Sequence, residues 1–386
     1  MGSASSVSKT NIFDREKMRA HGRSLIPVLC VIVFALIFHW LSGGSFLTSR
    51  NLSNLSRQVC VNLTLAVGMT LVILTSGIDL SVGSVLALSG MVAAITQVSL
   101  GWSSWGVEGA ILSALFSVSI GALSGGLTGI AVSRLRITPF IVTLGMMVIC
   151  RGLTLIISGA QAVAPIGDSL GSLSSDYLSP PASLLLLVIL GAGVLTSQVI
   201  AVVRGSQLIK SLQNAAYGII FCALAGLIFV GYRGIPYMVF VAVSCAVLGM
   251  FTLKYLRFGR FVYAIGGNRE AAELSGVPVK RTLWLTYFIM GCLSGLAGLM
   301  DVARVNGAVP SAGELAELDA IAAVVIGGTS LMGGVGGVAG TLFGVLIMGV
   351  LNNGMSLIGI SEHYQKVFKG IVIISAVYLD LRSKKK

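Results

Sequence analysis

Residues 338–358 read VAGTLFGVLIMGVLNNGMSLI, an uncharged and largely apolar run that is long enough to cross a bilayer as one helix. Eleven further apolar runs occur along the chain, separated by polar or glycine-rich segments. Together they predict an all-α polytopic membrane protein with about twelve transmembrane helices, of which the tenth is short. The predicted spans lie near 24–41, 58–76, 80–97, 109–132, 138–158, 183–203, 216–232, 236–253, 283–303, 318–332, 338–358 and 367–381.

The composition excludes a soluble protein and several functional classes. Of 386 residues, 55% are hydrophobic and 10% charged, and the mean hydropathy is +0.94. The net charge of +12 comes from Lys and Arg in short loops between apolar runs, which favours contact with the lipid bilayer and not with nucleic acid. The six cysteines lie in apolar runs and the three histidines are scattered, so we expect no disulfide framework, catalytic cluster, metal site or bound cofactor.

The distribution of basic residues predicts which side of the membrane each loop faces. With twelve spans, both termini share one side with the loop 254–282, and that side carries 19 of the 26 Lys and Arg residues. Because basic loops remain in the cytoplasm, the tails 1–23 and 382–386 and the loop 254–282 are expected to be cytoplasmic. No small-residue cleavage pattern follows 24–41, so this span is expected to be retained, and 24–381 to form one transmembrane domain.

The loop 254–282, KYLRFGRFVYAIGGNREAAELSGVPVKRT, is a basic interruption that contains the marks of a short helix. Asn268 is a good N-cap, Glu270 would lie in the first turn where the helix dipole favours a negative charge, and Gly276 suits the left-handed position after the last turn. We therefore predict a helix over Arg269–Ser275. Such a helix either binds a soluble partner, which is favoured, or lies on the membrane surface.

Ionisable side chains inside apolar runs are candidates for a solute path. Asp79 and Ser81, in SGIDLSVGS, begin the third span. Asp79 either caps that helix, which is favoured, or lines a path, and one residue can do both. Arg151 lies within the fifth span and either extends toward the membrane surface or pairs inside the bundle.

The last third of the chain adds four polar candidates. Glu317 and Asp319 begin the tenth span and are expected to cap it. Asn352 and Asn353 are neighbours in an apolar span, so they point to different faces and at least one faces protein or water. These side chains suit hydrogen bonding to a polar, uncharged solute.

Glycine patterns predict close packing and an interruption. Gly121, Gly125 and Gly129 lie four residues apart and would leave bare backbone along one face of a helix, which permits close helix packing in lipid. The segment 327–340, GGTSLMGGVGGVAG, predicts a broken span or tight turn lined by protein or water. Its G-x-G-x-x-A match precedes a membrane-length run, and no phosphate-binding G-x-x-x-x-G-K-[ST] motif occurs, so the sequence gives no basis for nucleotide chemistry in this chain.

The most specific segments are GMTLVILTSGIDLSVGS (68–84), PFIVTLGMM (139–147), GRFVYAIGGNREAAELSGV (259–277), PSAGELAELDAIAAVVIGGTSL (310–331), GGVGGVAGTLFG (333–344) and YQKVFKGIVIISAVYLD (364–380). Together they resemble the permease subunits of bacterial ABC importers for monosaccharides, in the ribose, xylose and galactose branch. The resemblance covers about 46–382. The spans within 183–232 resemble an inserted pair added to a ten-helix core, which makes the xylose permeases most similar.

This resemblance implies a homodimeric permease in the bacterial inner membrane that carries xylose or a similar pentose or hexose. A separate ABC ATPase subunit would hydrolyse ATP and dock on the loop 254–282, and a periplasmic sugar-binding protein would deliver the solute. The ATPase-coupling residues would be Gly266, Gly267 and Asn268, which set the entry turn of the loop helix, followed by Arg269, Glu270, Ala271, Ala272, Ser275 and Gly276. Bulk at Ala271 or Ala272 is expected to block coupling and leave the membrane fold intact.

Two other functions remain open at this point. A secondary sugar carrier or solute channel that acts alone would also need many spans and a polar interior, but it leaves the capped helix in the loop 254–282 without a role. A membrane-embedded enzyme would need a cluster of reactive side chains, which the sequence does not contain.

Overall fold

The computed structural model describes residues 28–205 and 207–384, so the predicted tail 1–23 lies outside the described residues. Helices dominate this range, with one short two-stranded pairing of β1 (Tyr177–Leu178) with β2 (Ile235–Pro236). A first apolar helix covers Val28–Leu41. The helices that follow are α2 (Ser49–Leu74), α3 (Val82–Val98), α4 (Val107–Ser133), α5 (Pro139–Ser158), α6 (Asp168–Ser175), α7 (Pro180–Val203), α8 (Leu208–Phe229), α9 (Tyr237–Tyr255), α10 (Arg257–Gly267), α11 (Arg269–Leu274), α12 (Val279–Val305), α13 (Ala316–Ile326), α14 (Val338–Leu357) and α15 (Glu362–Lys384).

Each predicted span falls on a helix, but the helices differ in length. Within the described residues, eight helices are long and apolar enough to cross a membrane, namely α2, α4, α5, α7, α8, α9, α12 and α14. The structure therefore confirms an all-helical polytopic protein, whereas the count of twelve spans and the side of each terminus stay predictions. The tenth predicted span, 318–332, is wrong in its extent because α13 ends at Ile326 and a glycine-rich loop follows.

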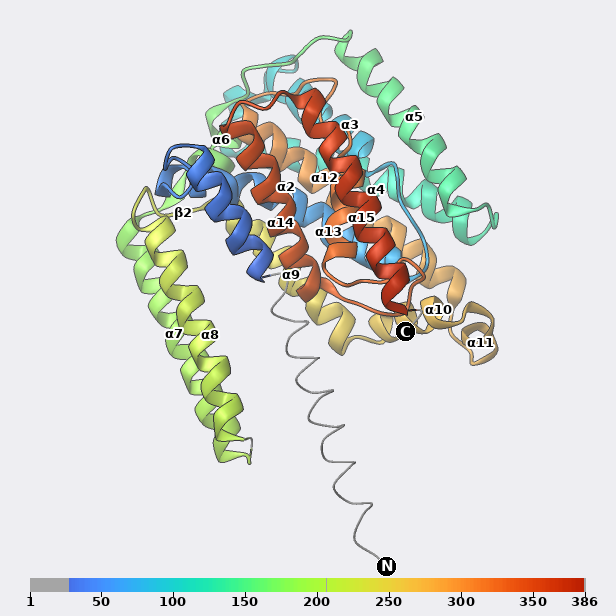
Figure 1. The fold of residues 1–386 in the computed structure, drawn as a ribbon. Helices are drawn as coiled ribbons and strands as arrows, with labels where there is room; N and C mark the ends of the chain where they lie inside the picture. The colour runs from blue at the N-terminus through green and yellow to red at the C-terminus, as the bar shows by residue number, and fades with distance from the viewer. Residues whose placement is uncertain (1–27, 206, 385–386) are drawn as a thin grey trace, which may run out of the picture.

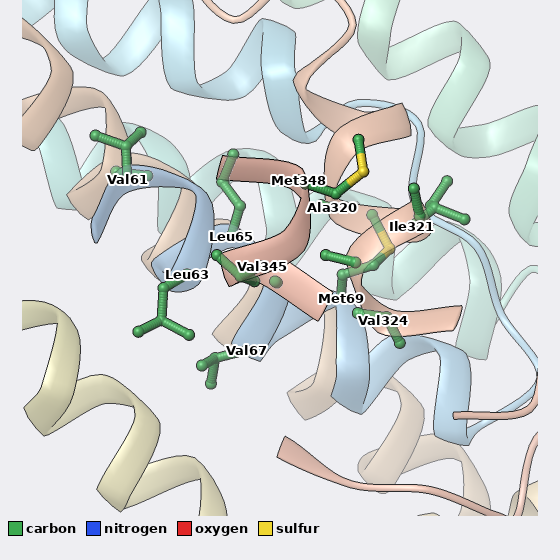
Figure 2. Packing of buried hydrophobic residues seen from close by; sticks show 14 of the residues in the cluster. Val61, Leu63, Leu65, Val67, Met69, Ala320, Ile321, Val324, Val345 and Met348 are labelled. Carbon is green, nitrogen blue, oxygen red and sulfur yellow. The ribbon is translucent and has the colours of Figure 1, made fainter. Parts of the chain in front are cut away.

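Helix α2 lies at the centre of the bundle. Every residue from Leu63 to Leu74 is buried, and α12, α14, α9 and α13 pack around it (Figure 1). Figure 2 shows alternate faces of α2 turned to different neighbours, with Met69 toward Val324 of α13. This half of α2 carries almost only apolar side chains on every face, which suits a central position inside the bundle.

The α4–α12 crossing depends on bare backbone, as the glycine spacing predicts. A Cβ atom added to Gly125 would lie 2.3 Å from the carbonyl oxygen of Tyr287 and 2.8 Å from the Cα of Gly291. A Cβ atom added to Gly121 would lie 2.2 Å from the carbonyl oxygen of Gly291. The glycines thus let the two backbones approach closely, which provides van der Waals packing in lipid.

Gly125→Val is therefore expected to lower the stability of the folded chain by about 1–3 kcal/mol, the usual cost of overpacking. Thermal unfolding in detergent measures the effect. Gly126→Val is the matched control, because the only atom within 4 Å of a Cβ at Gly126 belongs to the Phe288 ring, 3.7 Å away. Equal melting temperatures for the two variants would contradict the close crossing.

Helices α7 and α8 form an antiparallel hairpin beside the bundle (Figure 1). Ser183 and Leu187 are the buried residues that α7 contributes, and both lie in its first two turns next to the β1–β2 pairing. The rest of the hairpin exposes aliphatic side chains, which suits a lipid environment. Its description as a pair inserted into a ten-helix core stays a prediction.

Two non-helical segments, the first extended and the second made largely of turns, enter the bundle from opposite ends. Residues 75–81 follow the end of α2, next to α10 and α11, and residues 306–315 follow α12 at the far end. The two segments bring α3 and α13 together, because a Cβ atom added to Gly83 would lie 2.2 Å from the carbonyl oxygen of Gly313. The helices that follow, α3 and α13, have 17 and 11 residues. At 1.5 Å per residue both are shorter than a ~30 Å hydrocarbon layer, so neither alone spans it.

Candidate functional site

Asp79 lies buried in the first extended segment and turns back on that segment. Its Oδ1 accepts hydrogen bonds from the Ser81 backbone N–H at 2.8 Å and from the Ser81 hydroxyl at 2.6 Å. Ser81 occupies the N-cap position of α3 and makes no side-chain capping bond. The predicted cap is thus wrong in detail, because Asp79 stabilises the turn before α3 and does not bind the free N–H groups of the helix.

Arg151, on α5, is paired inside the protein. Its guanidinium donates to the carbonyl oxygens of Pro310 at 2.5 Å and Ala312 at 2.9 Å, both in the non-helical segment 306–315. These carbonyls have no helical N–H partners because the segment is not helical, so a cation with several donors satisfies them. Of the two predicted alternatives, pairing within the bundle is the one that the structure contains.

Arg151→Met is expected to loosen residues 306–315. Hydrogen bonds to a charged group contribute about 1.5–3 kcal/mol each, so the free energy of local opening should fall by about that amount. Amide hydrogen exchange of this segment in detergent measures the change. Arg233→Met is the control, because the Arg233 guanidinium stacks on the Tyr232 ring, 5.6 Å from its centre. Unchanged exchange in Arg151→Met would show that the segment is held by other contacts.

The acidic candidates of α13 have separate positions. The Glu317 carboxylate lies against α3, since a Cβ atom added to Gly83 would be 2.6 Å from its Oε2. The N-cap of α13 is Leu315, at φ 62°, and no side-chain capping bond forms. The expectation that Glu317 and Asp319 cap the helix by hydrogen bonds is therefore wrong. Their place in the first turn still suits the helix dipole.

Asp319 joins three helices through its carboxylate. Oδ2 accepts from the Asn352 amide of α14 at 3.0 Å and from the Lys369 ammonium of α15 at 2.8 Å. Asn353 turns the other way, and its amide oxygen accepts from Asn51 of α2 at 2.9 Å. The prediction that Asn352 and Asn353 face different directions is confirmed. Lys369 was not among the predicted site residues, because in the sequence it resembles an ordinary basic residue at the end of a span.

Asp319, Asn352 and Lys369 line a cavity of about 580 Å³ at the end of the bundle opposite α10 and α11. Gln58 and Asn62 of α2 line it as well. Two ion pairs border it: Arg304–Asp301 at 2.7 Å and Lys366–Glu314 at 3.0 Å. The cavity has the size of a small-molecule site. The other predicted path residues, Asp79, Ser81, Arg151, Glu317 and Asn353, lie outside its lining, so the seven candidates do not form one site.

The loop 254–282 forms the two helices α10 and α11 at the other end of the bundle. The predicted cap is confirmed, because Asn268 Oδ1 accepts from the Ala271 backbone N–H at 2.9 Å. Glu270 lies in the first turn and Gly276 adopts a positive φ of 81°. The helix ends at Leu274, one residue before the predicted Ser275. Its N-terminal and C-terminal signals were therefore readable in the sequence.

The two faces of α11 differ. Ala272 is buried and packs with Ile265, Val279 and Leu283, so this face attaches α11 to the rest of the bundle. Bulk at Ala272 would therefore disturb this packing, whereas the expectation that the membrane fold stays intact remains a prediction. Ala271 is exposed, and the Leu274 side chain at the end of the helix is 90% exposed. Leu274 was not among the residues predicted from the sequence to act in coupling.

Gly266 and Gly267 are the last residues of α10 and directly precede Asn268, the N-cap of α11, so they lie where the chain enters the predicted helix. A Cβ atom added to Gly266 would lie 1.8 Å from the carbonyl oxygen of Leu74 and 2.4 Å from the backbone nitrogen of Gly334. Gly267 faces open space. Gly266 is thus the point where α10 touches both the end of α2 and the glycine-rich loop 327–337.

Hydrogen bonds complete this junction. The Gly334 N–H donates to the Leu74 carbonyl at 3.0 Å, and the Ser76 hydroxyl donates to the Met332 carbonyl at 2.7 Å. The Tyr263 hydroxyl of α10 donates to the Gly336 carbonyl at 2.8 Å. Burial raises the pKa of Tyr263 above its usual range, so this donor keeps its proton at neutral pH. We call these contacts, together with Gly266, the loop junction.

Among the described residues, no group of three or more His, Cys, Asp or Glu side chains is placed to hold a metal ion. The chemistry of the two regions is hydrogen bonding and packing. One region is a polar cavity, and the other is an exposed helix attached through bare backbone to the interrupted segments.

Comparison with known proteins covers nearly the whole chain. Residues 51–377 match the family described as "Branched-chain amino acid transport system / permease component". The xylose transport system permease protein XylH of Escherichia coli K12 is 39% identical over 372 residues, which span 94% of this chain and 92% of that protein. The ribose import permease protein RbsC of the same strain is 38% identical, covering 93% and 92% of the two chains. RbsC of Bacillus subtilis is 38% identical, covering 96% and 98%. No solved structure matches.

Proposed function

Because the chain belongs to the branched-chain amino acid transport system / permease component family, we propose that it is the membrane-spanning subunit of an ATP-driven monosaccharide importer. Its substrate would be xylose or a similar pentose or hexose. The observation that carries this is the similarity to both xylose and ribose permeases, which spans 94% and 93% of this chain. The chain is a multi-pass protein of the bacterial inner membrane, and it binds no cofactor of its own in this proposal.

A cytoplasmic ABC ATPase subunit would dock on α11. Arg269, Glu270 and Ala271 are exposed there, and Leu274 presents an apolar side chain to solvent. Fully burying a leucine side chain stabilises a complex by about 1.5–3 kcal/mol, so Leu274 is the residue most suited to fill a pocket on the partner. A periplasmic sugar-binding protein would dock at the opposite end, where the polar cavity opens, and two permease copies would assemble as a homodimer.

The loop junction would transmit the movement of the ATPase. Helix α11 packs against α12 through Ala272, and α10 packs against α2 through Gly266. Because both contacts are close, a displacement of α11 would displace α2 and α12 as well. The same junction contacts the loop 327–337, which precedes α14 and follows the short α13. Coupling requires two arrangements that the partner binds with different affinity, and interrupted segments are where a packed bundle can rearrange.

Reconstituted transport tests this function. Labelled xylose or ribose uptake is measured in liposomes that contain the chain, its candidate ATPase and the candidate binding protein, with each component and ATP omitted in turn. The proposal expects uptake only when all are present. The alternative, a carrier or channel acting alone, expects uptake by this chain without ATP, and leaves the exposed Leu274 without a partner.

A further inference from the structure

A basic corner joins α9 to α10 at the end of the bundle that also holds α11 (Figure 1). Lys254 is in the last turn of α9, and Arg257 and Arg260 lie one turn apart at the start of α10. All three side chains are exposed, and none takes part in an ion pair among the side chains that the structure describes. The sequence contains no acidic residue between Asp176 and Glu270, so this charge has no acidic neighbour along the chain. We call Lys254, Arg257 and Arg260 the basic corner.

The backbone fixes the positions of these cations. Leu256 has an extended conformation between the two helices, and α10 begins after it with no side-chain capping bond and no acidic residue in its first turn. A Cβ atom added to Gly259 would overlap the carbonyl oxygen of Leu253, so α10 packs closely against the end of α9. Arg257 and Arg260 lie three residues apart, on the face opposite the buried residues of α10. The corner therefore presents its positive charge outward, and the partial charge of the helix N-terminus adds to it.

The face of α9 next to the basic corner is apolar and exposed. Its exposed side chains near this end are Val247, Leu248, Phe251 and Tyr255. The ring centres of Phe251 and Tyr255 are 5.2 Å apart, and the Lys254 ammonium lies 5.3 Å from the centre of the Tyr255 ring. Helix α9 is long and apolar enough to cross the membrane, and aromatic rings at the end of a span are typical of the level of the lipid headgroups. The cations are therefore placed where headgroups lie.

The chemistry of this surface fits an anionic phospholipid. A guanidinium presents its N–H donors in a planar fork that matches a phosphate group, and such charge-assisted hydrogen bonds are strong. A zwitterionic lipid also has a phosphate, but its own cation would lie among the cations of the corner. An acidic protein surface would satisfy the charges, but it would not cover the apolar side chains of α9 beside them. One anionic lipid meets both requirements, with its headgroup on the corner and its acyl chains on α9.

We propose that the basic corner and the adjoining face of α9 bind an anionic phospholipid, whose phosphate accepts hydrogen bonds from Arg257 and Arg260. Its acyl chains lie along the exposed face of α9. Helix α10 also forms the loop junction through Gly266, so the bound lipid would hold the helix on which the proposed coupling depends. The site requires only that the chain lies in the membrane, so its failure would leave the importer function untouched.

Native mass spectrometry of the full-length chain in detergent tests the site. The anionic probe is dioleoylphosphatidylglycerol, dioleoylphosphatidylcholine has the same acyl chains without the net charge, and glycerol 3-phosphate has the charge without the chains. We expect the first phosphatidylglycerol molecule to bind at least about tenfold more tightly than phosphatidylcholine, and glycerol 3-phosphate not to bind. Each basic residue near an anionic lipid surface strengthens binding about fivefold, so Arg257→Gln with Arg260→Gln should weaken phosphatidylglycerol binding about 25-fold. Binding of phosphatidylcholine should not change.

A second pair of arginines provides the matched control. Arg134 and Arg136 are exposed in the loop between α4 and α5, at the same end of the bundle. Arg134→Gln with Arg136→Gln removes the same charge and should bind phosphatidylglycerol as the natural chain does. Equal affinity of the natural chain for the two lipids, comparable binding of glycerol 3-phosphate, or equal weakening by the two glutamine variants would overturn the site.

A further variant and a second readout cover poor folding of the glutamine variant. Arg257→Lys with Arg260→Lys keeps the charge and should keep most of the affinity. Because a ligand that binds the folded state stabilises it, phosphatidylglycerol should raise the melting temperature of this variant and of the natural chain, but not that of Arg257→Gln with Arg260→Gln. If the glutamine variant kept its lipid affinity but bound the ATPase more weakly in phosphatidylcholine nanodiscs, the corner would be a protein interface and the lipid site would be overturned.

Discussion

Leu274→Asp is expected to weaken binding of the ATPase subunit to the chain strongly while leaving the bundle folded. The side chain is 90% exposed and touches none of the buried cluster around Ala272, so the melting temperature should not change. In the complex, the aspartate would place a charged group in the apolar pocket that we propose on the ATPase. A central apolar anchor contributes about 2 kcal/mol or more, so affinity should fall about 30-fold or further.

Affinity of the purified ATPase for the chain in nanodiscs measures this effect directly. Leu274→Met keeps an apolar side chain of similar volume and is expected to bind within a few-fold of the natural chain. If Leu274→Asp left the affinity unchanged, the ATPase would dock on a surface other than the C-terminal end of α11. Uptake in liposomes should fall in parallel with affinity, because hydrolysis in an undocked ATPase cannot drive the permease.

Gly266→Val is expected to separate ATPase binding from transport. A Cβ atom at this position would lie 1.8 Å from the Leu74 carbonyl oxygen, and backbone cannot yield as the end of a flexible side chain can. Helix α10 would have to move away from α2 and the loop 327–337, whereas the exposed face of α11 would remain available. Coupling free energies between sites are typically 1–3 kcal/mol, so uptake per ATP hydrolysed should fall about 5- to 150-fold.

The neighbouring glycine provides a matched control. A Cβ atom at Gly267 meets nothing within 4 Å, so Gly267→Val should retain coupling close to that of the natural chain. The measurement is the ratio of sugar transported to ATP hydrolysed in liposomes containing all three components. A ratio that is the same in both variants would mean that the loop junction does not carry the movement.

The sequence predicted those features that depend on local chemistry. Apolar runs located the helices, because a segment in lipid must satisfy its own backbone hydrogen bonds. The capped helix that begins after Asn268 was also predicted, because its N-terminal and C-terminal signals lie within ten residues of one another. The glycine spacing of α4 also predicted a close crossing, although the partner helix α12 was not identified, because spacing describes one face and not what lies against it.

Features that depend on residues far apart in the chain were missed or misplaced. Lys369 pairs with Asp319 across 50 residues, and nothing near Lys369 in the sequence distinguishes it from a topology signal. Asp79 and Glu317 were expected to cap helices, yet Ser81 and Leu315 hold those positions. The burial of Ala272 and the exposure of Leu274 were likewise hidden, because a six-residue helix is too short for its apolar pattern to define a face.

Sugar-stimulated ATP hydrolysis in liposomes tests the account most directly. The chain is reconstituted with its candidate ATPase and binding protein, and the rate of hydrolysis is compared with and without D-xylose or D-ribose. The account predicts stimulation that requires all three proteins, is lost in Leu274→Asp and is retained in Leu274→Met. Hydrolysis indifferent to sugar, combined with sugar uptake by the chain alone, would contradict it and make the chain a carrier.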